Sequence, residues 1–160
     1  MKNFELTNET VVNDFGVTLH RIRAVKDIVT SHFTVKAGEF GGFVEKVDNL
    51  ADNAWVYGDA MVYGDAMVYG DAMISGNARV YGDARVFRTN HYLVIGPIGS
   101  RDDYTTFFRS KEGTIKVKCG CFRGTTDEFL DKVEKTHGNS KYAKVYRIAT
   151  EMALAQIDMN

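Results

Sequence analysis

The stretch that decides the fold is residues 56–73, which read Val-Tyr-Gly-Asp-Ala-Met three times in succession. The same six-residue pattern extends in looser form from residue 44 to residue 91, which makes eight hexapeptides. An aliphatic residue opens all eight, alanine holds the fifth position in six, and glycine holds the third position in five. A fixed period of this kind indicates a repeat architecture, in which each unit buries its apolar side against its neighbours.

A period of six residues fits neither an α-helix nor an array of hairpins. We predict a three-sided coil with one short strand per side, so that residues three hexapeptides apart lie above one another at about 4.8 Å, the spacing of paired strands. The aliphatic residues point to the axis, alanine fits where space is small, and glycine with Asp or Asn makes the corners. The pattern predicts an outward aromatic ladder with Tyr63 on Tyr81 and Tyr69 on Phe87. It also stacks three further pairs: Met61 and Arg79, Met67 and Arg85, Met73 and His91.

These Val/Ile-x-Gly-Asp/Asn-Ala-x units resemble the hexapeptide-repeat, left-handed parallel β-helix family. The resemblance covers about 48 of the 160 residues and implies a fold rather than a function, because the family includes acyltransferases, carbonic-anhydrase relatives and plain scaffolds. It also implies a homo-oligomer, with a trimer favoured. Open strand edges and outward Tyr and Met side chains favour the same conclusion. The alternative is that these side chains pack against flanking segments of the same chain.

The flanks complete a fold that we predict to be mainly β. Residues 1–43 read as an N-terminal β cap, with two strands about a turn at residues 14–16. Residues 44–91 are the repeat, and residues 92–160 read as a C-terminal α+β unit. The strands expected near or within this last part lie at residues 91–95, 104–109 and 114–119.

Two helices are predicted to end the chain. Thr125 and Glu128 have the spacing of a capping box at the start of the first helix, and Gly138 ends it. The second helix runs from about residue 140 to 157 and carries one apolar face. The face comprises Tyr142, Val145, Tyr146, Ala149, Met152 and Ala153.

The composition limits the classes of partner. Lys and Arg number 20 and Asp and Glu 21, and this balance argues against a protein that works by neutralising the phosphates of nucleic acid. No apolar run approaches the roughly 18 residues that cross a bilayer, and the first residues lack the pattern of a signal peptide. Cys119 and Cys121 are poorly placed for an unstrained disulfide. We therefore expect a protein of the reducing cytoplasm, with no membrane partner.

The layout of the whole chain also resembles proteins encoded by bacteriophages and prophages. The opening segments that carry this resemblance precede the Tyr-Gly-Asp-Ala repeats and are Leu6-Thr-Asn-Glu-Thr10, His20-Arg-Ile-Arg23 and Gly38-Glu-Phe-Gly-Gly42. The tail segments are Val94-Ile-Gly-Pro-Ile-Gly-Ser-Arg101, Cys119-Gly-Cys-Phe122 and Thr136-His-Gly138. The resemblance brings no catalytic motif. It implies a small accessory protein made during infection, with counter-defence as one role.

The first candidate ligand site is the glycine-rich segment after the strand at 91–95, with Gly99, Ser100, Arg101, Thr105 and Thr106 as its binding residues. Free backbone N–H groups, hydroxyls and a guanidinium suit a small anion. The segment lacks the ending of a P-loop, and no helix follows at once as in a dinucleotide fingerprint. The alternative is a polar hairpin connection in which Arg101 pairs with Asp102 or Asp103.

The second candidate cluster comprises Lys116, Lys118 and Arg123. Strand alternation puts the two lysines on one face, and Arg123 together with the helix start near Thr125 favours an anion. The alternative is a solvated strand face. If the two clusters meet, phosphates or nucleotides become the expected ligands.

Residue type is the basis for naming candidate zinc ligands and candidate catalytic residues. Cys119, Cys121, His91 and His137 are possible zinc ligands, but the C-x-C spacing departs from the usual C-x2-C, and we expect neither a metal nor a cofactor. Cys121 as a nucleophile with His137 as its base is the remaining catalytic arrangement.

We therefore expect a non-enzymatic, oligomeric binding protein that sequesters a small anionic, nucleotide-like ligand or a host defence protein. One alternative is an acyltransferase of the hexapeptide type, which would need a histidine base, and the eight hexapeptides hold only His91. The other is a structural phage scaffold in which the repeat serves as a rigid spacer.

Overall fold

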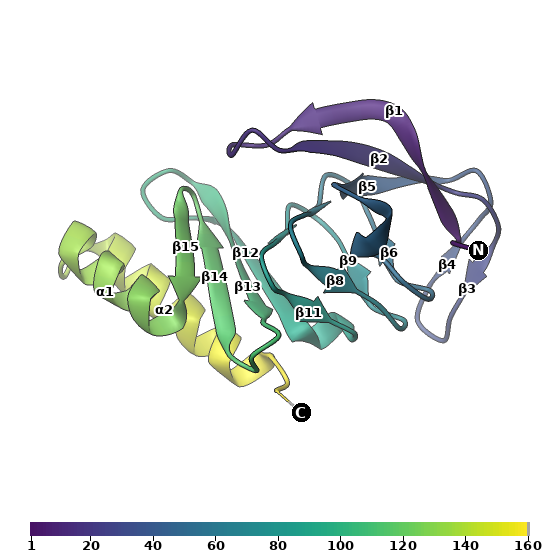
Figure 1. Ribbon diagram of the computed structural model, residues 1–160. Helices are drawn as coiled ribbons and strands as arrows, with labels where there is room; N and C mark the ends of the chain where they lie inside the picture. The colour runs from purple at the N-terminus through teal and green to yellow at the C-terminus, as the bar shows by residue number, and fades with distance from the viewer. Residues whose placement is uncertain (160) are drawn as a thin grey trace. The chain divides into compact units, whose positions relative to one another are not determined.

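The structure is a computed structural model that describes residues 1–159. The chain divides into two compact units, Met1–Thr89 and Asn90–Asn160. The fold is mainly β, and both α-helices belong to the second unit (Figure 1). Among the described residues, no helix has the length and apolar character needed to cross a membrane.

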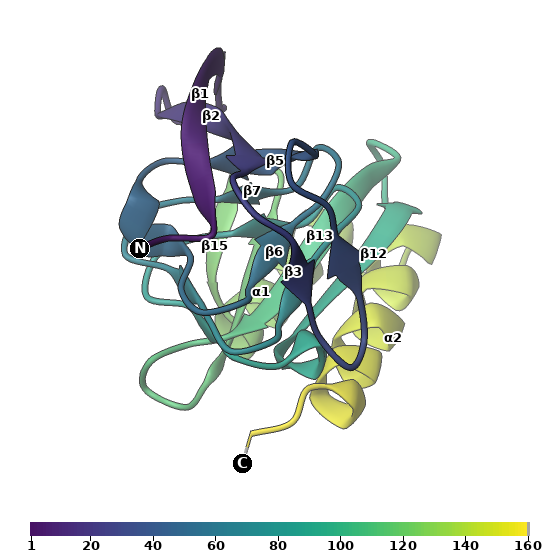
Figure 2. The ribbon, with the colours of Figure 1, turned by 90° about the vertical axis from the view of Figure 1, so that its right-hand side faces the viewer.

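The first unit opens with an antiparallel pair of strands. β1 (Phe4–Val12) pairs with β2 (Thr18–Ala24), and Gly16 lies in the turn with φ 77°, which confirms the predicted strands and turn. β2 then pairs with β5 (Phe40–Val44). β3 (Ile28–Val29) and β4 (Thr34–Val35) form a small hairpin beside the repeat (Figure 2), where Phe33 meets Tyr57 edge-on at 6.3 Å.

Short strands recur every six residues through the repeat. They are β6 (Trp55–Val56), β7 (Met61–Val62), β8 (Met67–Val68), β9 (Met73–Ile74), β10 (Arg79–Val80) and β11 (Arg85–Val86). Each of the first three pairs in parallel with the strand that lies three hexapeptides further along the chain, so that β6 joins β9, β7 joins β10 and β8 joins β11. β5 extends one of these ladders by pairing in parallel with β7. The predicted offset of three hexapeptides is therefore confirmed.

The interior of the repeat consists of the residues that the pattern selects. The opening residues of the hexapeptides are at most 1% exposed: Val44, Leu50, Val56, Val62, Val68, Ile74, Val80 and Val86. The alanines at the fifth position are at most 3% exposed: Ala54, Ala60, Ala66, Ala72, Ala78 and Ala84. Burial of these apolar side chains stabilises the stacked strands, because two-residue strands offer few hydrogen bonds of their own.

The corners of the repeat are regular where glycine or Asp52 holds the third position of the hexapeptide. The glycines at the third position have φ between 59° and 67°: Gly58, Gly64, Gly70, Gly76 and Gly82. In the second hexapeptide Asp52 takes this position with φ 56°. In the first hexapeptide Lys46 stays extended at φ −148°, and the chain turns instead through the 3-10 helix η1 (Val47–Asn49). The last hexapeptide, which has arginine at its third position, ends in the 3-10 helix η2 (Thr89–His91).

Ring stacking across the offset of three hexapeptides is as predicted. The ring centroids of Tyr63 and Tyr81 are 5.7 Å apart, and those of Tyr69 and Phe87 are 5.1 Å apart. Tyr63 and Tyr81 are only 3% and 7% exposed, so other side chains cover this part of the ladder and it does not face water. Stacked rings cover each other's faces, so a ladder of this kind removes much of its own area from water.

The neighbours predicted for the methionines hold in two of three cases. Met61 pairs with Arg79, and Met67 pairs with Arg85. The Met73 backbone N–H instead donates to the Thr89 Oγ1 at 3.2 Å, because the 3-10 helix η2, which includes His91, stands where a further strand would pair with β9.

The second unit is a four-stranded antiparallel sheet covered on one face by two helices (Figure 1). The strands follow in chain order as β12 (Tyr92–Ile98), β13 (Asp103–Arg109), β14 (Ile115–Cys119) and β15 (Phe122–Thr125). The helices are α1 (Thr126–His137) and α2 (Lys141–Gln156). The first three strands match the predicted ones, whereas β15 was not predicted.

The helix boundaries follow from the capping residues. The Thr125 Oγ1 accepts from the Glu128 N–H at 3.2 Å, and a Glu128 carboxylate oxygen accepts from the Thr125 N–H at 2.9 Å. This confirms the predicted capping box. Gly138 ends α1, and its N–H donates to the Glu134 carbonyl at 2.9 Å. The predicted apolar face of α2 is only partly correct, because Tyr142 and Met152 are exposed.

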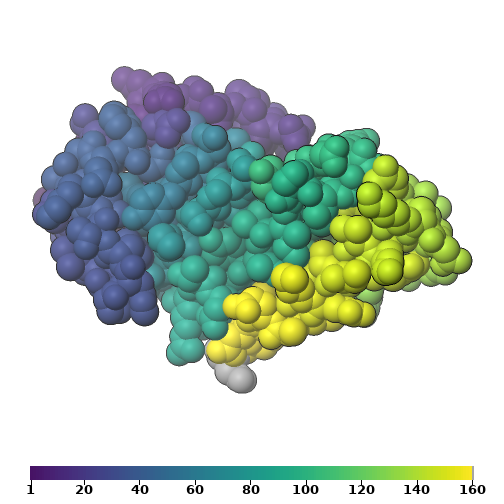
Figure 3. All heavy atoms as spheres, turned by 180° about the vertical axis from the view of Figure 1, so that it is seen from behind, coloured from purple at the N-terminus to yellow at the C-terminus, as the bar shows by residue number. Residues whose placement is uncertain are grey.

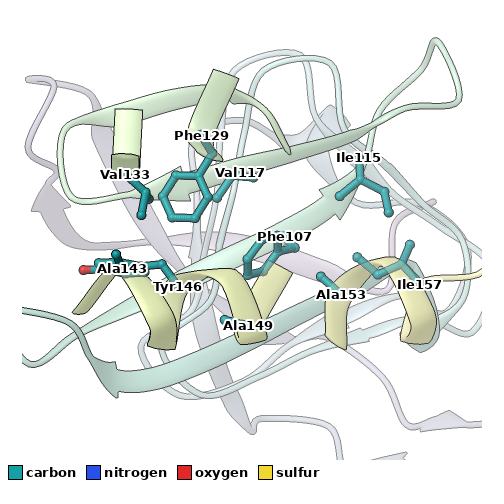
Figure 4. Packing of buried hydrophobic residues seen from close by; sticks show 10 residues of the cluster. All are labelled: Phe107, Ile115, Val117, Phe129, Val133, Ala143, Tyr146, Ala149, Ala153 and Ile157. Atoms are coloured by element: carbon teal, nitrogen blue, oxygen red, sulfur yellow. The ribbon is translucent and has the colours of Figure 1, made fainter. Parts of the chain in front are cut away.

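The core of the second unit joins the helices to one face of the sheet (Figure 4). Its buried members are Phe107, Ile115, Val117, Phe129, Val133, Ala143, Tyr146, Ala149, Ala153 and Ile157. Phe129 and Val133 extend from α1 toward the sheet and α2, and Phe129 meets Phe107 and Tyr146 edge-on at 6.2 Å and 5.5 Å.

Candidate functional site

A hollow in the second unit lies where two hairpin tips meet the two helices. We call it the tip pocket, and its volume is about 250 Å³. The sheet contributes Ser100, Arg101, Asp103, Cys119, Gly120, Cys121 and Phe122. The helices contribute Phe129, Lys132, Val133, Thr136, His137 and Tyr146.

Aromatic side chains form much of the pocket wall. Phe129 is central, since its ring centroid lies 5.3 Å from that of Phe122 and 5.5 Å from that of Tyr146. The His137 ring lies 5.7 Å from Tyr146 at a tilt of 30°. These rings are fixed by the core behind them, so the wall is formed before any ligand arrives.

Tyr146 reaches the pocket through a gap that a glycine leaves. A Cβ on Gly99 would lie 1.8 Å from the Tyr146 hydroxyl, and Gly99 has φ 79°. The close approach buries the phenol, and burial raises the pKa of Tyr146 from 10.0 to about 12, with Cys119 and Asp103 adding to the rise and Arg101 opposing it. Tyr146 is therefore a neutral hydroxyl near neutral pH.

Cys119 faces the helices with a hydroxyl beside it. The Thr105 hydroxyl donates to the Cys119 Sγ at 3.3 Å, and the two residues are cross-strand partners. Cys121 lies two residues on, in the turn that Gly120 opens with φ 56°. Both thiols are free and both line the pocket.

The rim of the pocket carries more positive than negative charge. Arg101 extends from the β12–β13 tip and Lys132 from α1, and both are exposed, while Asp103 is the one carboxylate among the described lining residues. Across residues 1–159, no ion pair includes Arg101 or Lys132. The alternative in which Arg101 pairs with Asp102 or Asp103 is therefore not what the structure shows.

The two predicted clusters do not form one site. Ser100 and Arg101 line the pocket, and Thr105 supports it through Cys119. Gly99, predicted to offer its backbone to a ligand, instead makes room for Tyr146.

The remaining predicted residues lie on the opposite face of the sheet. They are Thr106, Lys116, Lys118 and Arg123, which cross-strand pairing places side by side and which alternate with the core-facing residues. Lys118 is 7% exposed, and its Nζ donates to the Gly120 carbonyl at 2.6 Å. The condition that the two clusters meet is not fulfilled, because strand alternation places Lys116, Lys118 and Arg123 on the face of the sheet opposite to the pocket.

Sequence reasoning missed Lys132 and Tyr146 as pocket residues. One signal was available: the three tail segments singled out above, 94–101, 119–122 and 136–138, are distant in the sequence, and each contributes to this pocket. Cys121 and His137 also share it. Among the described residues, no group of three or more His, Cys, Asp or Glu side chains is placed to hold a metal ion.

Comparison with known proteins bears on the repeat alone. The family model described as YdcK Beta solenoid repeat matches residues 54–70, which contain β6, β7 and β8. The chain is similar to that family over this stretch and contains a β-solenoid-like repeat. Neither the comparison with curated proteins nor the comparison with solved structures found a match.

Proposed function

We propose that the second unit is a binding module that holds a small anionic molecule in the tip pocket without turning it over. The observation that carries the proposal is the convergence of Arg101 and Lys132, from separate elements, on a hollow with aromatic walls. A guanidinium with no ion-pair partner in the described chain offers charge-assisted, bidentate hydrogen bonds to a carboxylate or phosphate.

The size of the pocket limits the ligand. Pockets for drug-sized molecules measure about 300–1,000 Å³, and the tip pocket at about 250 Å³ falls below that range. We therefore propose a ligand with one ring or a short chain and one anionic group, smaller than a dinucleotide.

The repeat is proposed to serve as a rigid scaffold, wound as a left-handed β-helix of hexapeptides. The offset of three hexapeptides and the buried aliphatic and alanine positions support the scaffold. The left hand is proposed from the resemblance to hexapeptide-repeat proteins alone. An acyltransferase would need a histidine base in the repeat, whereas His91 is buried in η2. A crystal structure with right-handed winding would contradict the proposed hand.

Because the layout of the chain resembles that of phage-encoded proteins, we propose a counter-defence role, in which binding removes a small host molecule. Expression in a bacterium that carries a defence system driven by such a molecule should restore phage growth. The Arg101→Gln variant should not restore it.

Binding itself is tested by native mass spectrometry of protein purified from expressing cells and by calorimetric titration with phenyl phosphate. A hydrogen bond to a charged group contributes about 1.5–3 kcal/mol, so Arg101→Gln should weaken binding by about 10- to 100-fold. Arg123→Gln is the matched control, because it removes the same charge from the opposite face of the sheet. Equal loss in both variants, or none in Arg101→Gln, would remove the tip pocket as the site.

A further inference from the structure

The outward side of α2 carries an apolar stripe that the chain itself leaves uncovered. Ile148 and Met152 are 50% and 52% exposed, and Val145 beside them is half-buried. Figure 3 shows α2, in yellow, open along its outer side. This stripe is separate from the side of α2 that packs in the core through Ala143, Tyr146, Ala149 and Ala153, so the helix has two apolar sides.

The spacing of the stripe is that of a helix-pairing seam. Val145 and Met152 are seven residues apart with Ile148 between them, and Lys141 and Ala155 extend the line by one turn at each end. Steps of four, three, four and three residues are the repeat of helices that pack along one another. A stripe with this period fits a partner helix, which would cover all three apolar side chains at once.

Two charged residues beside the stripe indicate which partner helix would fit it. Lys144 and Glu151 are also seven residues apart, lie on one edge of the stripe, and are both exposed. Within residues 1–159, neither takes part in an ion pair. When two α2 helices run antiparallel about a two-fold axis near Ile148, equivalent edges meet, and Lys144 of each copy faces Glu151 of the other. A parallel pair would place each Lys144 against a position that Ala149 occupies, and no ion pair would form.

We propose that the partner of this stripe is a second copy of the chain, joined through an antiparallel α2–α2 seam. Ile148 meets its equivalent at the centre, Val145 of each copy packs against Met152 of the other, and two Lys144–Glu151 pairs fix the direction. α2 has 16 residues, or about four turns, so the dimer is concentration-dependent rather than permanent.

Sedimentation velocity of the full chain over a range of concentrations tests the seam. The wild type should pass from monomer to dimer. Ile148→Glu places two carboxylates at the centre of the seam and should leave a monomer at every concentration. Leu154→Glu is the matched control, because Leu154 is a 55% exposed apolar residue of the same helix that lies about 120° around the helix from Ile148. It should dimerise like the wild type, and circular dichroism should show equal helix content in both variants.

Charge reversal tests the direction of the helices. Lys144→Glu alone or Glu151→Lys alone should raise the dimer dissociation constant by about tenfold, because each creates two like-charge contacts. The double variant Lys144→Glu/Glu151→Lys should return it to the wild-type value. A wild type that stays monomeric, an oligomer of any size that survives Ile148→Glu, or a double variant no better than the single ones would overturn the proposal.

Discussion

Replacing Gly99 with alanine tests how the tip pocket is built. The added Cβ would lie 1.8 Å from the Tyr146 hydroxyl and 2.4 Å from the Tyr146 Cζ, so the ring has to leave its place. Gly113 provides the matched control, since it has φ 76° against 79° for Gly99 and no atom within 4 Å of its ideal Cβ. Gly113→Ala therefore measures backbone strain alone, about 1–2 kcal/mol for a left-handed alanine.

Gly99→Ala should cost this strain and the overpacking in addition, which is about 1–3 kcal/mol. The expected loss of unfolding free energy is about 2–5 kcal/mol in total. In a Tyr146→Ala background, Gly99→Ala should cost no more than Gly113→Ala, because the ring that it displaces is gone.

The unfolding of the two units can be followed separately, by two different spectroscopic signals. Both α-helices belong to the second unit, so far-ultraviolet circular dichroism in urea reports its unfolding, whereas the single tryptophan, Trp55, reports the first unit. Gly99→Ala should shift the dichroism transition and leave the Trp55 transition unchanged. Equal costs for Gly99→Ala and Gly113→Ala would refute the argument that this glycine exists to admit Tyr146.

Two further predictions concern a titration and a buried amide. Because the pKa of Tyr146 rises from 10.0 to about 12 on folding, the unfolded chain loses a proton that the folded chain keeps between those values, so the second unit should lose stability as the pH rises through this window. Tyr146→Phe should flatten that dependence, as measured by urea unfolding at successive pH values; an unchanged slope would contradict the assigned pKa. Asn49 is fully buried, and its Nδ2 donates to the carbonyls of Gly64 at 3.2 Å and Ala66 at 2.8 Å. Asn49→Ala should destabilise the first unit by about 2–4 kcal/mol in the Trp55 transition. Asn53→Ala, which removes the contacts of a half-exposed side chain with Asn3 and Asp71, should cost about 1 kcal/mol or less; similar costs would show that burial is not the cause.

The repeat could be predicted from the sequence because one short pattern sets both its register and its core. An aliphatic residue recurs at every sixth position. Once the number of sides of the coil is known, the strand that pairs with any given strand is therefore known as well. The pattern fails in the first and last hexapeptides, where Lys46 and Arg88 hold the third position and 3-10 helices follow, but it holds in the second, where Asp52 adopts φ 56°. A third-position residue that tolerates positive φ, here glycine or Asp52, is thus the local signal that separates a regular corner from an irregular one.

The pocket could be predicted only in part, because it depends on distances that no short-range pattern encodes. The mixture of donors in the segment around Ser100 and Arg101 indicates a ligand site, and the structure places these two residues in the lining of the pocket. Strand alternation alone shows that Lys116 and Lys118 share a face, but the side on which the helices pack decides whether this face meets Arg101. The sequence pattern predicts that Tyr146 lies on the buried face of its helix. Its place in the pocket wall depends in addition on Gly99, which lies far earlier in the chain.

The pairing of each strand with the one three hexapeptides further along restricts how this gene can change in length. Tandem segments of nearly identical sequence, such as residues 56–73, readily gain or lose copies when DNA is replicated. Insertion of one hexapeptide would transfer every later strand to a different ladder, whereas insertion of three returns each strand to its own ladder. Natural variants of this chain should therefore differ in repeat length by whole sets of three hexapeptides.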